Sequence, residues 1–215
     1  MNLPFTVEQF FDVFGVYNEA VWPMQIVLYL LALIAIFFAF IKFKNSDKII
    51  SAVLAFFWLW IGIVYHLIYF TAINKAAYLF GILFIGQGLL FFYVGDMKSK
   101  LSFKFHADFY SVFGGIFILY ALIIYPIIGY QLGHIYPRTP TFGLPCPTTI
   151  FTWGLLLWTN KVVPKYVIII PLVWSIIGFG AAWGLSIYQD YGLLIAGILG
   201  TFLVIIRDKK YMINN

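Results

Sequence analysis

Seven long apolar stretches divide the chain and constrain its fold more than any other feature of the sequence. A helix needs about 20 mainly apolar residues to cross the hydrocarbon core of a bilayer. Only 10% of the residues are charged and 63% are hydrophobic, against roughly 25% and 45–50% in a soluble domain. We therefore predict an all-α integral membrane bundle, one transmembrane domain over residues 1–215, with seven transmembrane helices. The predicted spans are Val21–Ile41, Ile49–Thr71, Ala76–Val94, Phe109–Tyr130, Leu144–Trp158, Tyr166–Ser186 and Tyr191–Ile206.

The fifth stretch is shorter than the others and begins with Pro145 and Pro147. It is either a short full span or a re-entrant half-helix. The Lys and Arg residues decide between the two, because cytoplasmic loops carry an excess of them. If all seven stretches cross, the basic residues divide 11 to 2 between the two sides, and a re-entrant fifth stretch makes the division 6 to 7. The larger set is Lys42, Lys44, Lys48, Lys98, Lys100, Lys104, Lys161, Lys165, Arg207, Lys209 and Lys210, and the smaller set is Lys75 and Arg138.

This asymmetry favours seven spans, with the N-terminus outside and the C-terminus in the cytoplasm. It also explains the basic charge balance of +5 as an orientation signal, so no nucleic-acid partner is predicted. The expected partners are the lipid bilayer and a small solute.

Residues 1–20 are predicted to form an amphipathic helix at the outer membrane interface. Thr6 and Gln9 have the spacing of a capping box, in which the cap side chain and the third helical residue satisfy each other's backbone amides. Phe10 and Phe14 then recur at helical spacing, opposite Asp12. Such a helix either lies in the outer leaflet or packs over the end of the bundle.

The apolar stretches contain few groups capable of chemistry. None has an Asp, Glu, Lys or Arg residue at its middle, where a proton-coupled transporter usually needs one. The sequence also lacks a zinc-protease, lipase-type or P-loop motif. With a single cysteine, no intrachain disulfide can form. We therefore predict no enzyme activity and no cofactor.

Two polar residues remain inside predicted spans. Gln87 lies between Gly86 and Gly88, so it can hydrogen-bond across a close helix contact. His66 lies toward the outer end of the second span. Each is either an interhelical packing residue or a contributor to a ligand site.

The densest group of unusual residues opens the fifth stretch, where Cys146, Thr148 and Thr149 follow one another closely. A helix that begins near the outer surface leaves amides free to hold an anion or another polar group. Cys146 is also considered as a metal ligand, although no metal site is predicted. With Glu19 and His66, this helix start forms the predicted outer polar site, in which Glu19 contacts His66.

Three segments resemble a known family: Leu3–Thr6, the YNEAVWP segment of residues 17–23, and the GLPCPTTIF segment of residues 143–151. The chain is similar to bacterial polytopic membrane proteins that carry only a domain-of-unknown-function label. The resemblance implies a multi-pass protein of the bacterial inner membrane and supplies no activity, substrate or site residue.

The predicted function is that of a small permease-like protein, which binds or facilitates passage of a small solute from an outer polar site. The candidate ligand-binding residues are Glu19, His66, Gln87, Cys146, Thr148 and Thr149. The alternative is a non-transporting scaffold or sensor subunit that acts through helix contacts.

Overall fold

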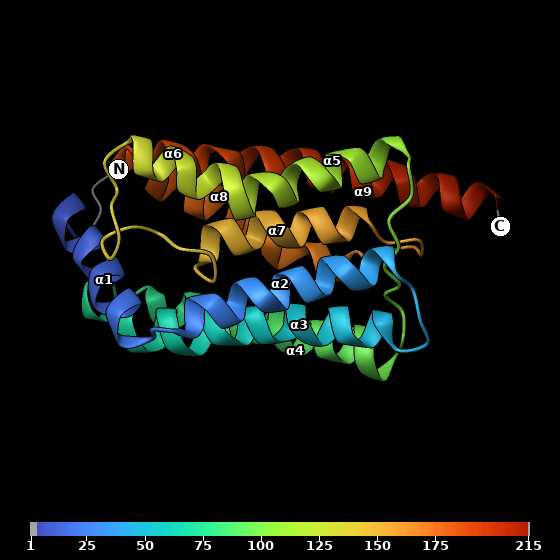
Figure 1. Ribbon diagram of the computed structural model, residues 1–215, viewed down its shortest axis with the longest axis horizontal. Helices are drawn as coiled ribbons and strands as arrows, with labels where there is room; N and C mark the ends of the chain where they lie inside the picture. Colours follow the sequence, from blue (N-terminus) through green and yellow to red (C-terminus); the bar gives the residue numbers. More distant parts are fainter. Residues whose placement is uncertain (1–3, 215) are drawn as a thin grey trace.

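The computed structural model describes residues 4–214 and has helices throughout, with no strand in that part of the chain (Figure 1). Residues 1–3 of the predicted N-terminal helix, which include Leu3 of the first family-like segment, lie outside the described residues. The elements in chain order are α1 (Val7–Ala20), α2 (Met24–Phe40), α3 (Ser46–Trp60), η1 (Ile61–Tyr69), η2 (Phe70–Ala72), α4 (Ala77–Phe91), η3 (Phe92–Met97), α5 (Phe109–Leu119), η4 (Tyr120–Ile124), α6 (Tyr125–Gln131), α7 (Pro145–Leu157), α8 (Tyr166–Leu185), η5 (Tyr188–Asp190) and α9 (Tyr191–Asn214).

Several of these elements join into longer apolar rods because π-helical and 3-10 segments continue the preceding helix. Among the described residues, five rods are long and apolar enough to cross a membrane, and α1 with α2 makes a sixth if that bent pair is one span. The five are Ser46–Ala72, Ala77–Met97, Phe109–Gln131, Tyr166–Leu185 and Tyr188–Ile213. The bounds of the first four rods agree with the predicted stretches to within three residues, and the last rod continues to Ile213, beyond the predicted end at Ile206. The other two predicted spans correspond to α2, with 17 residues, and α7, with 13.

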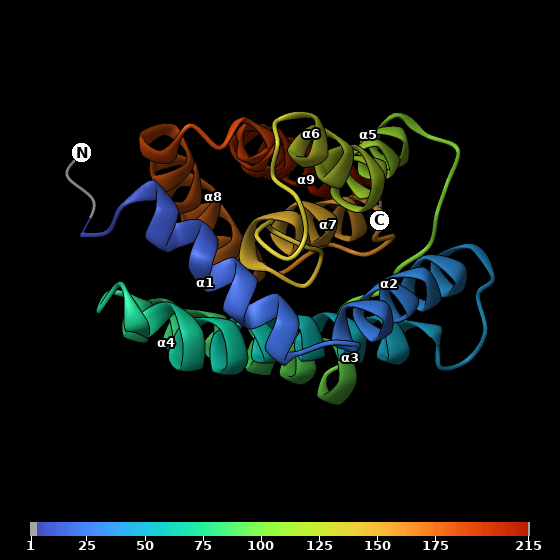
Figure 2. The same cartoon turned by 60° about the vertical axis from the view of Figure 1, so that its left-hand side comes forward.

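Helix α7 lies in the middle of the bundle, with the other helices around it (Figures 1 and 2). All of its residues except Cys146 are buried, and it packs against α5, α8 and α9. The segments before and after α7 lie at opposite ends of the bundle (Figure 1), so the helix does not turn back as the re-entrant alternative required. Because protein encloses it, α7 has no lipid thickness to match.

The chain reaches α7 through irregular backbone that descends into the bundle. Phe142, Gly143 and Leu144 are all buried, as non-helical backbone at this depth must be. Gly143 has a φ of +96°, and an added Cβ would collide with the side chain of Leu28. Glycine is therefore required here both by its conformation and by the close approach of α2.

Helix α1 turns through 84° relative to α2 and crosses one end of the bundle (Figure 2). The predicted capping box is present: the Gln9 amide donates to Thr6 Oγ1 at 3.2 Å, and the Thr6 amide donates to Gln9 Oε1 at 2.9 Å. Residues such as Phe14 and Tyr17 are buried against the bundle. Of the two predicted arrangements, the structure contains the contacts of a helix packed over the bundle end. We refer to this end as the α1 end.

The side chain of Asn18 fixes the loop between α6 and α7 to α1. Its Nδ2 donates to the carbonyls of Pro137 at 2.6 Å and Thr139 at 2.8 Å, and its Oδ1 accepts from Thr141 Oγ1 at 2.9 Å. Arg138 adds an exposed ion pair with Asp12 at 2.8 Å. The YNEAVWP segment thus contributes a structural latch, since it holds the loop that leads into α7.

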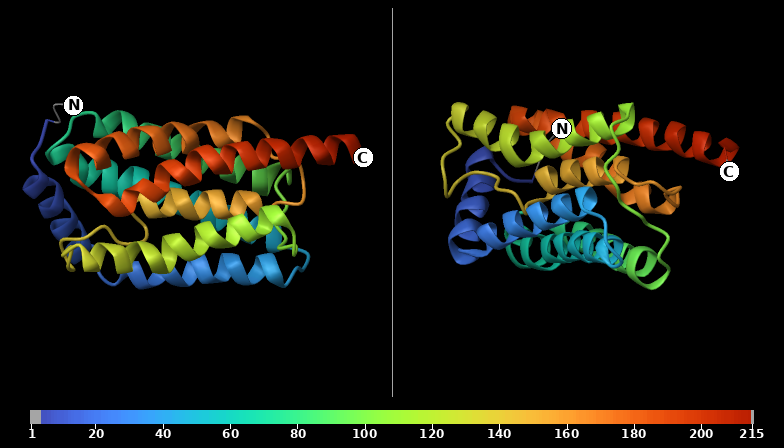
Figure 3. Two further views of the ribbon diagram at one scale, coloured as in Figure 1. Left: turned by 90° about the horizontal axis from the view of Figure 1, so that it is seen from above. Right: turned by 45° about the vertical axis from the view of Figure 1, so that its right-hand side comes forward.

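At the opposite end, α9 projects beyond the other helices (Figure 3). From the sequence, Arg207 was counted among the basic residues of the loops. In the structure it is buried, with 1% of its surface exposed. Its Nη2 lies 2.7 Å from Asp208 Oδ1, and its Nη1 donates to the Leu156 carbonyl at 2.7 Å. The last carbonyls of a helix have no hydrogen-bond partner within it. Arg207 therefore provides a donor for one of those carbonyls at the C-terminal end of α7.

Candidate functional site

A cavity of about 210 Å³ opens beneath α1. Its wall is built from the N-terminal segment and α1, the outer parts of η1 to α4, the start of α7, the facing parts of α6 and α8, and the η5 turn before α9. The lining extends from the α1 end to about the middle of α8. Segments far apart in sequence thus meet at one end of the bundle, as they do in ligand sites between the helices of bundles.

Aromatic rings form most of the wall. They are Phe5, Phe10, Phe14, Tyr65, Phe70, Phe80, Tyr125 and Trp174. The rings contact one another in series: Phe10 lies 4.6 Å from Phe14 and 5.8 Å from Phe70, centroid to centroid, and Phe80 lies 5.3 Å from Trp174. These contacts give the aromatic residues of α1 a structural role, since they cover the cavity at the α1 end.

The polar part of the wall centres on Asp190. Asp190 is 5% exposed, and its Oδ1 accepts a hydrogen bond from Tyr125 Oη at 2.5 Å. The thiol of Cys146 also donates to this carboxylate. Asp190 directly precedes α9, where the positive end of the helix dipole stabilises a negative charge. In the described structure it has no ion pair with Lys, Arg or His.

Local sequence explains how the side chains of Asp190 and Cys146 come together. Ser186 ends α8 in a left-handed conformation, with φ 58°, and the short η5 turn then brings Asp190 to the start of α9. Pro145 is suited to the first position of α7, since its fixed φ matches a helix and its missing N–H would have had no partner there. The start of α7 and the start of α9 therefore lie at the same end of the bundle.

Cys146 is the one predicted site residue that lines the cavity. Thr148 and Thr149 are buried within α7. Thr148 Oγ1 accepts from the Gly143 amide at 3.2 Å, so it stabilises the entry of the chain into α7. Thr149 Oγ1 has no hydrogen-bond partner among the described residues.

The start of α7 is a poor site for an anion, which is one of the two kinds of ligand considered from the sequence. Pro145 and Pro147 occupy two of its first three positions, and a proline has no N–H to donate. The Asp190 carboxylate beside Cys146 adds negative charge at the same place. Both features disfavour an anion in the cavity.

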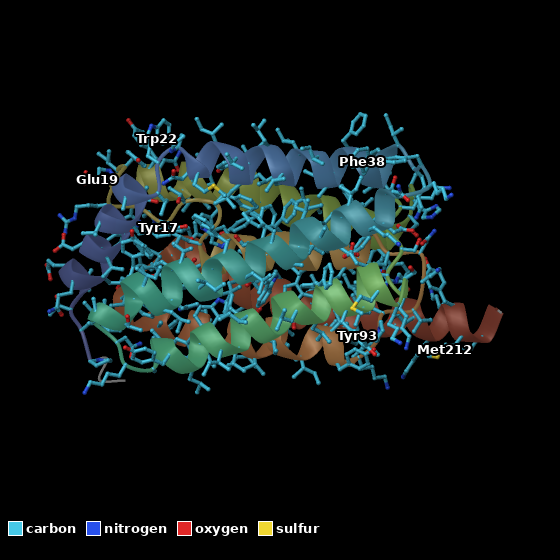
Figure 4. All side chains as sticks on the ribbon, turned by 90° about the horizontal axis from the view of Figure 1, so that it is seen from below. Tyr17, Glu19, Trp22, Phe38, Tyr93 and Met212 are labelled. Carbon is cyan, nitrogen blue, oxygen red and sulfur yellow. The ribbon has the colours of Figure 1, made fainter. Side chains whose placement is uncertain are left out.

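The predicted contact between Glu19 and His66 is absent from the described structure. Glu19 is exposed and lies at the edge of the molecule, whereas Tyr17 of the same helix points inward (Figure 4). His66 is fully buried, with its ring 4.7 Å from Phe84 and 5.2 Å from Trp174. Neither of its ring nitrogens has a hydrogen-bond partner in the part of the chain described. It packs behind the aromatic wall.

Gln87 joins two helices outside the cavity. Its Nε2 donates to the Val167 carbonyl of α8 at 3.0 Å. The flanking glycines differ: a Cβ on Gly88 would lie 2.9 Å from a backbone oxygen of α3, whereas one on Gly86 would have open space around it. Only Gly88 provides the close approach expected from the sequence, and Gln87 acts in helix association.

A second polar pair lies near the cavity but does not line it. Gln189 Nε2 lies 2.9 Å from His134 Nδ1, and the His134 ring packs 4.4 Å from Phe11 of α1. Partial burial lowers the pKa of His134, and the hydrogen bond with Gln189 opposes this shift. The pair connects the loop after α6 to the turn before α9.

Within residues 4–214, no group of three His, Cys, Asp or Glu side chains is placed to hold a metal ion. Sequence reasoning missed the main polar residue of the cavity, Asp190, together with its partner Tyr125. The available signal was an acid directly before a predicted span, on the side of the membrane with few basic residues.

Comparisons with known proteins give one match. Residues 7–215 match the family described as "Family of unknown function (DUF6064)", which confirms the expected membership in an uncharacterised family. No curated protein and no solved structure matches the chain. Function therefore has to be inferred from the cavity itself.

Proposed function

We propose that this chain, which belongs to the DUF6064 family of unknown function, is a seven-span protein of the bacterial inner membrane that binds a small solute at its outer face. The single observation that supports binding is the cavity of about 210 Å³ beneath α1. An engineered apolar cavity of about 150 Å³ is large enough to bind benzene. A cavity of this size at a surface therefore suits a compact, mainly apolar solute.

The distribution of basic residues supports the proposed topology. The connections between η3 and α5 and between α7 and α8 both lie at the end opposite α1 (Figure 1). They contain Lys98, Lys100, Lys104, Lys161 and Lys165. Burial of Arg207 beside Asp208 removes one charge from the count, but the asymmetry remains large. Under the positive-inside rule, this asymmetry supports an outer position for α1 and the cavity. Reporter fusions after Lys104 and Lys165 should report the cytoplasm, and a fusion after Arg138 should report the outer side.

The proposed activity is binding with or without facilitated passage, and no chemical transformation. Below the cavity, the bundle is filled by buried rings. Trp58 stacks on Phe84 at 4.5 Å between centroids, and its Nε1 donates to Thr152 Oγ1 at 3.0 Å. Passage to the other end therefore requires these helices to separate, whereas binding from the α1 end requires no such movement.

Binding is tested with purified protein in nanodiscs and benzyl alcohol as a neutral probe of suitable size. Titration calorimetry should show saturable binding, which raises the unfolding temperature of the protein. Ala181 lines the cavity and is only partly buried, so Ala181→Phe should fill the space and abolish binding while the protein stays folded. Equal heats from the native protein and this variant would refute the proposed site.

Vesicle experiments then distinguish the two functional classes. A facilitator should let the bound solute equilibrate across reconstituted vesicles faster than the Ala181→Phe variant does. Binding without flux would assign the protein to the sensor or scaffold class.

A further inference from the structure

We propose that the solute is an organic cation, an ammonium group on a small apolar body, which pairs with Asp190 in the aromatic cavity. This inference rests on the proposed function and specifies the ligand of the same cavity. It is carried by the placement of one buried carboxylate in a wall that is otherwise almost entirely aromatic and aliphatic.

The carboxylate of Asp190 has spare capacity to accept hydrogen bonds. An ionised carboxylate offers about four lone-pair sites, and the described donors are the Tyr125 hydroxyl and the Cys146 thiol. Both donors are neutral, and the dipole of α9 offsets only part of the negative charge, so the carboxylate has no full positive charge beside it. A buried charge without a partner is costly, and an opposite charge with good geometry offsets that cost. An ammonium group in the cavity would supply this charge.

The surrounding rings favour the same class of ligand. The face of an aromatic ring carries partial negative charge and attracts a cation that lies within about 6 Å of its centroid. Phe70, Phe80 and Trp174 line the cavity together with Asp190. Aromatic walls of this kind are a recurrent means of recognising ammonium ligands. They disfavour an anion for the same reason.

An inorganic cation fits the cavity poorly. A metal ion needs several oxygen, nitrogen or sulfur ligands, and no such group of three acidic, His or Cys side chains occurs within residues 4–214. An ion in the cavity would exchange its hydration water for contact with apolar walls, which cannot coordinate it. An organic cation instead places its charge at Asp190 and its apolar body against the rings.

The cavity volume limits the size of this body. Benzene fits an apolar cavity of about 150 Å³, so a cavity of about 210 Å³ accommodates a ligand of roughly eight non-hydrogen atoms. Benzylamine, which is an ammonium ion at pH 7, and benzyl alcohol, which is neutral, both have this size. The two probes differ mainly in charge.

The test compares the affinities of these two probes for the full-length protein in nanodiscs. Benzylamine should bind about 10-fold or more tightly than benzyl alcohol, because a hydrogen bond to a charged partner is stronger than a neutral one. In Asp190→Asn the ratio should fall to about one, since the amide keeps the shape and can still accept from Tyr125. The exposed carboxylate of Glu19, at the same end of the bundle, provides the control: Glu19→Gln should keep the native ratio.

The outcomes distinguish failure of this inference from failure of the proposed function. Equal affinities of the native protein for the two probes would overturn the organic cation while leaving the binding cavity intact. Failure of both probes to bind would overturn both proposals. A native preference for benzylamine that persists in Asp190→Asn would place the cation elsewhere and overturn the role of Asp190. The comparison within the native protein remains decisive if Asp190→Asn fails to fold.

Discussion

Replacing Arg207 with methionine should destabilise the bundle strongly, although the sequence places this residue among ordinary loop charges. Its guanidinium is bonded to Asp208 Oδ1 at 3.0 Å through Nε and at 2.7 Å through Nη2, and to the Leu156 carbonyl at 2.7 Å. Methionine fills much of the same space without a donor. The variant leaves the buried Asp208 carboxylate without its cation, and breaking such a pair costs roughly 3–5 kcal/mol.

The double variant Arg207→Met with Asp208→Asn should be more stable than Arg207→Met alone. It removes both charges, and asparagine can still accept from the Val163 amide, which donates to Asp208 Oδ2 at 2.8 Å in the native protein. The remaining cost is the unpartnered Leu156 carbonyl, about 1–3 kcal/mol. Recovery of about 2 kcal/mol on adding the second substitution is therefore the expected sign of a buried ion pair.

The measurement is reversible unfolding by SDS in mixed micelles, followed by tryptophan fluorescence. Lys209→Met is the matched control, because Lys209 is the exposed basic residue two positions away on α9 and should change the free energy of unfolding by less than about 0.5 kcal/mol. If Arg207→Met behaves like this control, or if the two substitutions simply add, a buried and coupled ion pair between Arg207 and Asp208 is refuted.

Three further predictions follow from close contacts at other positions. Gly88→Ala should destabilise the protein by about 1–3 kcal/mol in the same SDS assay, because the Cβ would crowd a backbone oxygen of α3; Gly86→Ala should be neutral, and equal effects would contradict the helix packing. Asn18→Ala should speed protease cleavage of the loop between α6 and α7, since three hydrogen bonds to that loop are lost, and unchanged cleavage would exclude the latch. Because burial lowers the pKa of His134 in the folded protein, the unfolded chain takes up the proton first, and stability should fall as pH drops through about 6.5. His134→Asn should reduce this pH dependence of the unfolding temperature, and an unaltered pH profile would exclude the role of His134.

The helical rods could be predicted well because their signal is local. The predicted stretch Phe109–Tyr130 corresponds to the observed rod Phe109–Gln131, and the Thr6–Gln9 capping box forms as expected. Both depend on hydropathy or spacing within one segment. Such signals can be recognised in the sequence without knowledge of tertiary contacts.

The candidate site was harder to predict because it depends on contacts between distant segments. Asp190 and Tyr125 are 65 positions apart, and nothing in either segment alone indicates that they meet. His66 was assigned to an outer polar site because it lies toward the outer end of the second predicted span, but its place in η1 directs it among aromatic rings. Cys146 was found because an unusual local sequence, with proline on both sides, coincides with the start of α7.

The enclosure of α7 has a consequence for the biogenesis of the protein. A helix of 13 residues that contains three threonines offers little gain on partitioning alone from the translocation channel into lipid, where insertion scales reward about 20 apolar residues. Its neighbours α5, α8 and α9 provide the surface that it needs, and two of these three are synthesised after it. In the proposed seven-span topology, α7 is therefore expected to wait at the channel, or beside α5, until α8 and α9 emerge from the ribosome. Membrane insertion and tertiary assembly are thus coupled for this one segment.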